Sequence, residues 1–286
     1  MTKEWTEDGQ ATEGKAAEPI SIIRPTTRRE SSESLAVHSH QEDPAVLVID
    51  IGGSAVKLFS NVSSEVRRFD SAPSLTPGHL VATVREHTRD WQYQLVSIGY
   101  PGKVGANNPI EEPGNLGSGW PGYDFAAAFG CPVRIVNDAS LQAIGGYAGG
   151  TMLFLGLGTG LGSALVVEHT VVELDLGGLP YGADEILSDR LGRKGLERDG
   201  REAWLATLTL VVERLRHAFL ADYVLLGGGH ADEVDPLPEM ARRGDNDDAF
   251  IGGVLLWRDG FEDHAGWRQR GSNVWRLLRE ERKENT

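Results

Sequence analysis

The sequence contains little that would support an extracellular, membrane-spanning or metal-stapled protein. Its 286 residues include one cysteine, Cys131, which permits no internal disulfide and no cysteine-rich zinc site. A single thiol is typical of a reduced cytoplasmic protein with one structural cysteine. No apolar run reaches the roughly eighteen residues that a membrane span requires. The charged residues 1–20 include no apolar stretch, so we expect no secretory signal.

Positive charge is also scarce. Lys and Arg total 28 against 42 Asp and Glu, which gives a net charge of -14. Such a surface repels a phosphate backbone unless a local basic patch overrides it, and no large patch is visible. We therefore expect no nucleic-acid partner and no membrane partner. Four basic residues that could form a track for a polyanion, or that are ordinary solvated surface, are Lys57, Arg67, Arg68 and Lys103.

Residues 1–44 are polar, rich in Glu, Ser, Thr and Pro, and have little periodicity, so we predict a disordered tail. From Val46 the texture changes to apolar runs separated by turn residues. The first set of predicted strands covers 46–51, 55–61, 64–70, 93–100 and 131–138, with helices at 75–91, 123–130 and 139–150. The pattern then restarts with strands between 151 and 174, a long helix at about 202–219 and a strand at 222–227.

The two blocks share one plan, which is an apolar strand, a glycine-rich turn, a second apolar strand and then helices. This internal duplication predicts an α/β protein with two lobes, residues 45–140 and 141–258, that face each other across a central cleft. The segment "NVWRLLREERKENT" within residues 259–286 predicts a terminal amphipathic helix. It would pack on a lobe or on a partner subunit, as in a homodimer.

The first glycine turn, Asp50-Ile51-Gly52-Gly53-Ser54, follows the strand "VLVIDI". Glycines let the backbone approach an anion, and successive amides form a concave donor surface. An aspartate at a strand end can hold Mg²⁺ through water, and Lys57 can neutralise phosphate charge. The alternative is a tight β-hairpin that needs two glycines for its dihedral angles.

Two more glycine turns follow. Gly156 to Ser163 places four glycines and Thr159 between two strands, which suits a phosphate cradle. A strand rather than a helix follows, and no Walker lysine is present, so this is neither a Rossmann nor a P-loop motif. A flexible β-turn is the alternative. Gly227, Gly228 and Gly229 end an apolar strand, so they either let a flat group lie on bare backbone or simply connect the strand to a loop.

Asn137 and Asp138 end the strand "PVRIV". A carboxylate at a strand end, beside an amide that orients a substrate, is a plausible general base. The alternative is an N-cap pair for the helix that starts nearby, because Asn and Asp commonly cap helices.

Taken together, "DIGGS", "VNDAS", "LGLGTGLGSAL" and "LLGGG" resemble the ROK family of the actin-like ATPase (ribonuclease H-like) superfamily, which holds sugar kinases and sugar-responsive repressors. The stretch from Asn115 to Leu165 is especially similar to the polyphosphate glucokinase branch. The resemblance covers about Val46 to Trp257.

The resemblance implies roles for these residues. Asp138 would take the proton from a hydroxyl of a glucose-like hexose, and Asn137 and Asn115 would bind that sugar. Asp50 would hold Mg²⁺ through water. The donor, ATP or polyphosphate, would lie on the first two glycine turns and the triple glycine, whose residues are Asp50, Gly52, Gly53, Ser54, Lys57, Gly158, Thr159, Gly160, Gly227, Gly228 and Gly229.

The sugar loop departs from the family pattern. The family reads Glu-x-Gly-His after the second phosphate turn, whereas this chain reads Asp175-Leu176-Gly177-Gly178. Asp175 is one methylene shorter than the glutamate, and Gly178 has no side chain where the histidine belongs. Glu173 offers another register, but the "GLPY" that follows anchors the alignment against it. A further sugar-binding glutamate would align with Ser188.

Three hypotheses follow from this departure. The first is a hexose kinase that uses Mg²⁺ with ATP or polyphosphate. The second is a non-catalytic relative that binds a sugar or a nucleotide. The third, a ROK repressor, requires an N-terminal helix-turn-helix, and residues 1–44 are too polar to build one.

Overall fold

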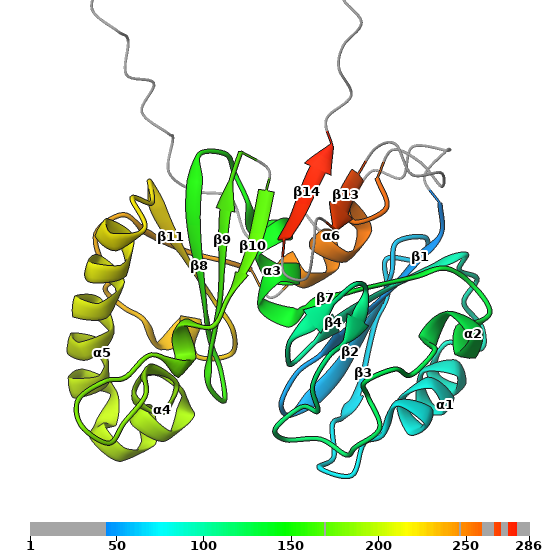
Figure 1. Ribbon diagram of the computed structural model, residues 1–286, viewed down its shortest axis with the longest axis horizontal. Coiled ribbons are helices and arrows are strands. Elements are labelled where there is room, and N and C mark those ends of the chain that lie inside the picture. Colours follow the sequence, from blue (N-terminus) through cyan, green and yellow to red (C-terminus); the bar gives the residue numbers. More distant parts are fainter. Residues whose placement is uncertain (1–43, 169, 246, 259–265, 270–273, 279–286) are drawn as a thin grey trace, which may run out of the picture. The chain divides into compact units, whose positions relative to one another are not determined.

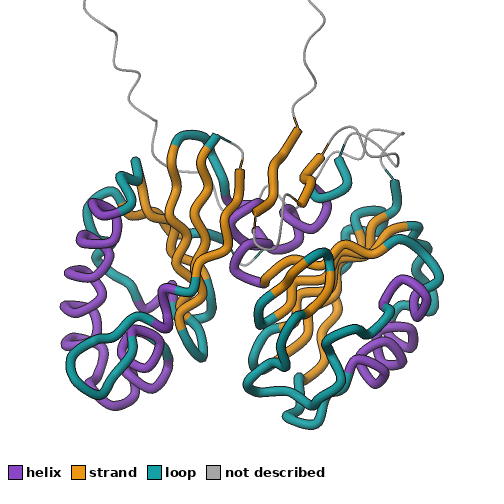
Figure 2. The backbone as a smooth tube through the Cα atoms, viewed as in Figure 1, coloured by secondary structure: helices purple, strands orange, loops and turns teal. Residues whose placement is uncertain are grey.

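The computed structural model describes residues 44–168, 170–245, 247–258, 266–269 and 274–278. Two large sheets, a two-stranded hairpin and the helices beside them make up this part of the chain (Figure 1). The predicted disordered tail lies outside the described residues except for Pro44. The tube in Figure 2 shows helical segments flanking both groups of strands.

The first sheet has five strands in the order β3-β2-β1-β4-β7. Strands β1, β4 and β7 are parallel, whereas β2 and β3 continue from β1 as an antiparallel meander. All residues of β1 and β4 are buried, as expected of central strands covered on both faces. The strands are β1 (Val46–Ile51), β2 (Ala55–Ser60), β3 (Val66–Asp70), β4 (Leu95–Tyr100) and β7 (Val133–Asn137). A separate hairpin joins β5 (Val104–Gly105) and β6 (Asn108–Pro109).

Helices α1 (Pro77–His87) and α2 (Phe125–Phe129) pack on one face of the first sheet. Thr76 caps α1, and Pro77 stands in its first turn, where the missing N–H costs no hydrogen bond. Asp124 caps α2, and Gly130 ends it in the left-handed conformation with φ of 74°. The apolar cluster on this face joins alternate β1 residues to α1 and α2.

The second sheet has seven strands in the order β12-β11-β8-β9-β10-β14-β13. Helices α4 (Leu187–Leu191) and α5 (Arg193–Ala218) cover one face, where Trp204 and Leu208 are buried against β8 and β11. Helix α5 is interrupted at Gly200, where φ is 76°. The strands are β8 (Thr151–Leu157), β9 (Leu161–Val167), β10 (Thr170–Leu174), β11 (Tyr223–Gly227), β12 (Ala241–Arg243), β13 (Gly266–Gln269) and β14 (Val274–Leu278). Two 3₁₀ turns, η1 (Leu176–Gly178) and η2 (Ala231–Glu233), follow β10 and β11.

Helices α3 (Asp138–Gly146) and α6 (Asp248–Leu255) pack against each other and against both sheets, in one apolar cluster. Residues of α6 contact the first sheet although they come late in the chain. The rings of Phe59 and Phe250 stack at 5.0 Å. The Ser97 hydroxyl donates to the Gly253 carbonyl at 2.6 Å and accepts from the Trp257 indole at 2.8 Å. The end of the predicted second lobe, residues 141–258, is thus fixed to the first sheet.

The predicted strands and helices are found from Val46 to Gly227 with shifted ends: the helices at 75–91 and 139–150 end at 87 and 146, and the long helix begins at Arg193 rather than near residue 202. The hairpin of β5 and β6 and the helix α4 were not predicted. The predicted terminal helix is wrong for the described residues, because Val274–Leu278 is a strand that pairs antiparallel with Thr170–Val172 of β10. A short apolar run suits either structure, and β14 covers the open hydrogen-bonding edge that β10 would otherwise present. None of the helices within the described ranges is long and apolar enough to cross a membrane.

Candidate active site

The two aspartates predicted to carry chemistry lie at one edge of the first sheet. Strands β1, β4 and β7 are parallel, so their carboxyl ends meet there, and Asp50 is in register with Gly99 of β4. Asp138 follows β7 directly and opens α3. A methyl group on Gly99 would lie 3.3 Å from Asp50 Oδ1 and 3.5 Å from the Asp138 Cα. A methyl group there would also lie 2.8 Å from Leu141 Cδ2, so the backbone of Gly99 lies directly beside Asp50 and the start of α3.

The proximity changes the acidity of Asp138. The pKa of its carboxyl is raised to about 7, first by burial and then by the charge of Asp50, against a hydrogen bond from the Ala139 N–H at 2.8 Å. Burial also raises the pKa of Asp50, which is 6% exposed, and the charge of Lys57 partly offsets this. Lys57 is the β2 partner of Asp50 in the register. A carboxylate with a pKa near neutrality is suited to accept a proton during a reaction.

The side chain of Asn137 is occupied by local structure. Its Oδ1 accepts from the N–H groups of Ala139 and Ser140 at 3.0 and 3.2 Å, which caps α3. Its Nδ2 donates to the carbonyls of Gly102 at 3.2 Å and Tyr100 at 3.5 Å. The capping alternative for Asn137 is therefore what the geometry shows, and its side chain aims α3, and Asp138 with it.

The first and second glycine turns lie against each other. A methyl group on Gly53 would lie 2.8 Å from Thr159 Oγ1 and 3.2 Å from Asn115 Nδ2. Three predicted site residues from separate segments thus meet at one place. The first turn is also a tight hairpin, as the alternative held, because the Gly52 N–H donates to the Ala55 carbonyl at 3.0 Å.

The second and third glycine turns share one edge of the second sheet. Gly227 of β11 is in register with Gly156 of β8, and the His230 N–H donates to the Leu157 carbonyl at 2.9 Å. Gly228 has φ of 81°, and a methyl group there would lie 2.5 Å from the Leu157 oxygen. Gly229 is exposed and has open space beside it. The three turns therefore adjoin one another, with Gly229 open and Gly227 covered by the side chains of Phe154 and Gln142.

The predicted sugar loop is open and bonded to itself. Asp175 caps η1, and its Oδ1 accepts from the Gly178 N–H at 3.2 Å. Both residues are exposed. Ser188, which aligns with a sugar-binding glutamate, instead accepts from the Leu161 N–H at 3.1 Å and so supports the second glycine turn. Asp175 and Ser188 thus form hydrogen bonds with their own loop and with the second glycine turn.

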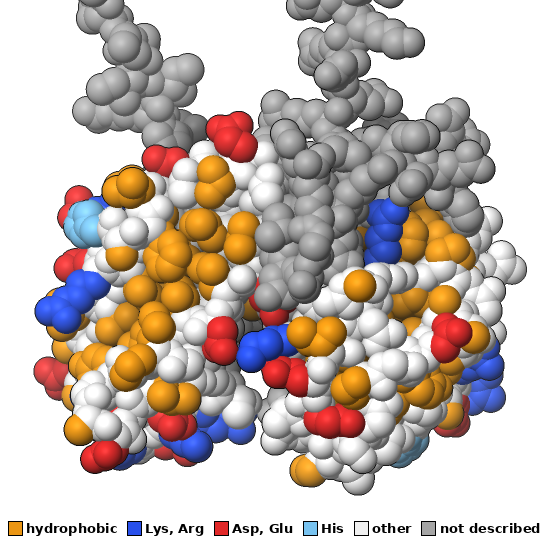
Figure 3. Space-filling view, in the orientation of Figure 1, with side chains coloured by type: hydrophobic (Ala, Val, Ile, Leu, Met, Phe, Trp, Pro, Cys, Tyr) orange, Lys and Arg blue, Asp and Glu red, His pale blue; other side chains and the backbone are white. Residues whose placement is uncertain are grey.

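Sequence reasoning set Glu173 aside, yet β10 places it near the site. The pKa of Glu173 is raised to about 7, first by burial and then by the charges of Asp138 and Glu111, while the charge of Lys103 lowers it. Lys103 Nζ lies 3.5 Å from Glu111 and 3.9 Å from Asp175, which links the turn between β4 and β5 to the cap of η1. Figure 3 shows acidic and basic side chains beside one another where the two lobes meet. The sequence signal that could have found Glu173 is its carboxylate within the otherwise apolar strand "TVVEL".

Two of the four basic residues considered for a polyanion track lie on β3, the edge strand of the first sheet. Arg67 pairs with Glu65 and Asp90 and stacks on the Trp91 ring, with its guanidinium 4.4 Å from the ring centre. Arg68 lies on β3, the outer strand of the first sheet, and pairs with Lys57 of β2. For Arg67 the alternative of ordinary surface therefore holds, because acidic partners already neutralise this residue.

The residues present suit a magnesium ion held mainly by its substrate. In the described part of the chain, no three acidic, histidine or cysteine side chains come close enough together to chelate an ion. Mg²⁺ keeps several waters and commonly uses one or two carboxylates together with substrate phosphates. Asp50, buried beside the first glycine turn, fits that role.

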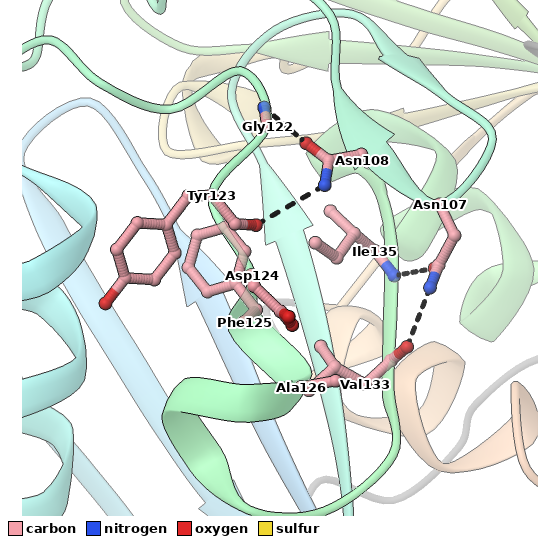
Figure 4. A pocket seen from close by; sticks show the side chains of 9 residues that line it. All are labelled: Asn107, Asn108, Gly122, Tyr123, Asp124, Phe125, Ala126, Val133 and Ile135. Atoms are coloured by element: carbon pink, nitrogen blue, oxygen red, sulfur yellow. Dashed lines mark hydrogen bonds between the residues drawn. The ribbon is translucent and has the colours of Figure 1, made fainter.

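A pocket of about 350 Å³ lies apart from these residues, beside β6, α2 and β7 (Figure 4). Its two asparagines are fully engaged. Asn107 bonds to Val133 and Ile135, while Asn108 bonds to Tyr123 and Gly122. This pocket is a hydrogen-bonded structural feature and contains none of the predicted site residues.

Two α/β lobes with glycine turns and an aspartate at their strand ends define the fold of the actin-like ATPases, as ROK-family sugar kinases have it. No protein-family model and no curated protein matches the chain. Solved structures do. The inorganic polyphosphate/ATP-glucomannokinase from Arthrobacter sp. strain KM is similar with a TM-score of 0.65 and 21% identity, over 74% of this chain and 97% of that one.

Two further solved structures share the fold. The ROK hexokinase from Thermus thermophilus gives a TM-score of 0.53 at 18% identity, over 76% of this chain and 100% of that one. The ROK family glucokinase from Streptomyces griseus, solved with glucose and AMPPNP, gives 0.51 at 15% identity over the same shares. These likenesses concern the fold, which confirms the predicted fold class.

Proposed function

We propose that this protein is a ROK-type sugar kinase that transfers a phosphoryl group from ATP or polyphosphate to a hydroxyl of a glucose-like hexose. The observation that carries the proposal is the meeting of three features. Asp50 and Asp138 lie together at the carboxyl edge of the first sheet, and the turn at Gly53 touches the turn at Thr159. The glucomannokinase and glucokinase folds of the similar structures support it.

The donor side uses backbone rather than side chains. Main-chain amides of the first two glycine turns would hold the donor phosphates, and the triple glycine at Gly227–Gly229 would face adenosine when the donor is ATP, with Gly229 its open end. Phosphoryl transfer needs positioning and charge neutralisation more than covalent help. Mg²⁺ beside Asp50 would supply part of that neutralisation, and Lys57 a second part.

On the acceptor side, Asp138 would act as the general base. The hexose hydroxyl gives its proton to the Asp138 carboxylate while its oxygen forms a bond to the terminal phosphorus, and the bond from that phosphorus to the bridging oxygen breaks. A base of this kind contributes roughly 10²–10⁴-fold to the rate. Asn137 keeps the carboxylate aimed by capping α3. Asn115, beside Gly53, and the loop at Asp175 and Gly178 would border the sugar.

A second candidate function is non-catalytic binding of a sugar or a nucleotide. The exposed Gly178 and the bonding of Asp175 to its own loop favour it, because both remove expected sugar contacts. Losing two or three hydrogen bonds of about 1 kcal/mol each would weaken sugar binding by roughly a hundredfold.

The test is release of ADP, or of shortened polyphosphate, across a panel of hexoses with the wild-type chain and the Asp138→Asn variant. Asp124→Asn is the matched control, because Asp124 is an exposed N-cap far along the chain from the glycine turns. We expect turnover that Asp138→Asn removes and Asp124→Asn keeps. Donor binding without turnover on any sugar would replace the kinase with the binding function.

Membership in the ROK family and in its polyphosphate branch is part of the same proposal, resting on the four motifs together with the fold. A cytoplasmic location, a homodimer and the lack of a nucleic-acid or membrane partner stay predictions.

A further inference from the structure

Arg193 joins the first two glycine turns. It opens α5, and its main-chain N–H donates to the Gly158 carbonyl at 2.9 Å. Its guanidinium Nη2 donates to the Ser54 hydroxyl at 3.2 Å. The preceding residue has no room for a side chain, because a methyl group on Gly192 would lie 2.7 Å from the Thr159 oxygen. The backbone thus fixes the base of Arg193 on one turn while its charged end reaches the other.

The charge of Arg193 is unneutralised, unlike that of its neighbours. Each nearby cation has a carboxylate: Arg190 pairs with Asp199, Lys194 with Asp189, Arg198 with Glu185 and Arg201 with Glu233. No carboxylate of the described residues forms an ion pair with Arg193, whose side chain is exposed. A single uncompensated guanidinium therefore stands over the place where Gly53 and Thr159 meet.

A guanidinium suits the chemistry of that place. Its planar fork of donors matches the oxygens of a phosphate group in a bidentate manner. The glycine turns supply amides but no lysine of the P-loop kind. The guanidinium donates one hydrogen bond to the neutral Ser54 hydroxyl. A phosphate oxygen can replace this acceptor and form a stronger bond, because it carries a negative charge.

We propose that Arg193 binds the phosphoanhydride of the donor across the two turns. The inference rests on the proposed function and names a residue for its donor side. Arg193 would stabilise the negative charge that builds on the leaving phosphate as the bond between the terminal phosphorus and the bridging oxygen breaks. It takes no proton and forms no covalent bond. Both donor classes, a nucleoside triphosphate and polyphosphate, present this chemistry.

The test compares Arg193→Gln and Arg193→Lys with Lys194→Gln, which removes one positive charge from the adjacent exposed position. Calorimetry would measure binding of a non-hydrolysable ATP analogue and, separately, of polyphosphate. We expect Arg193→Gln to weaken at least one donor about 10- to 100-fold and Arg193→Lys to weaken it less. Hexose affinity and the Lys194→Gln variant should match wild type.

The outcomes separate this inference from the kinase proposal. Unchanged binding of both donors by Arg193→Gln overturns the role of Arg193 even when the wild type phosphorylates sugar. Weakened donor binding in a protein that phosphorylates no sugar keeps the role and overturns the kinase. A wild type that binds neither donor overturns both. Circular dichroism checks that Arg193→Gln folds, and Arg193→Lys carries the comparison if it does not.

Discussion

Replacing Asp138 with asparagine should stabilise the folded protein at alkaline pH. The pKa of Asp138 rises from 3.8 to about 7 in the folded chain, mainly through burial. Between these values the folded chain holds a proton that the unfolded chain has released, so the stability of the wild type falls as pH rises through this window. Above pH 7 the full cost of the buried charge remains. Asparagine carries no charge and avoids that cost.

The size of the effect follows from the two pKa values. Each pH unit between them corresponds to about 1.4 kcal/mol, which sets an upper limit of about 4 kcal/mol at pH 8. The side chain is partly exposed, so water screens its charge and we expect about 1–2 kcal/mol. For a chain of this size each kcal/mol raises Tm by about 2–4 °C. At pH 5 the gain should shrink to roughly a third, because only the interval from 3.8 to 5 contributes.

Thermal unfolding followed by circular dichroism at pH 8 and pH 5 measures this difference. Asp124→Asn makes the same chemical change at an exposed cap, and its effect on Tm should not grow with pH. A Tm gain for Asp138→Asn that is equal at both pH values, or a loss at pH 8, would refute the reasoning that Asp138 is a carboxyl of raised pKa. The unfolding measurement needs no substrate, so it is independent of the kinase assay.

Two further predictions concern activity and a third concerns sugar binding. The pH–rate profile should rise to a plateau, with half-maximal kcat/KM near pH 7, the pKa of Asp138. Asp50→Asn should move this midpoint to lower pH, because it removes a charge that raises the pKa of Asp138. An unmoved midpoint would contradict the electrostatic interaction between the two aspartates. Gly53→Ala should lower activity by up to about 100-fold, because its methyl group would lie 2.8 Å from Thr159 Oγ1 and misplace the turns; unchanged donor KM and kcat would count against their contact. Gly178→His, at an exposed position whose Cβ would lie 3.3 Å from Asp175 Oδ1, should tighten glucose binding about 2- to 10-fold in calorimetry, and no change would show that the sugar-loop register is wrong.

The sequence allows the strands and their turns to be predicted well, because each has a local pattern. A buried strand that ends in Asp-x-Gly-Gly or in Gly-x-Gly needs no distant information, and β1, β8 and β11 lie where the pattern places them. The restart of that pattern also predicts the two sheets. In the first sheet, β1, β4 and β7 are parallel, so their carboxyl ends lie at the same edge. This brings Asp50 and Asp138 together.

The remaining features depend on pairings between distant segments. Asparagine chemistry is the same for a cap and for a ligand, so only the contacts of Asn137 with Gly102 and Ser140 distinguish the two. The lone charge of Arg193 is visible only after its neighbours have found their carboxylates. The strand Val274–Leu278 forms because β10 offers an edge, about a hundred residues earlier in the chain.

The crossing of α3 and α6 has a consequence for how this sequence can vary. A methyl group on Gly145 would lie 1.9 Å from the Asp248 carbonyl oxygen, and one on Gly252 would lie 2.0 Å from that of Leu141. The two helices thus meet backbone to backbone, and Asp138 stands at the first turn of one of them. Neither glycine can be replaced without a cost. Even alanine would push α3, which carries Asp138, away from α6, which is fixed to the first sheet. In a saturation library of this chain, these two positions should tolerate glycine alone, while the exposed sugar loop at Gly178 accepts many residues and offers room for the evolution of a new acceptor.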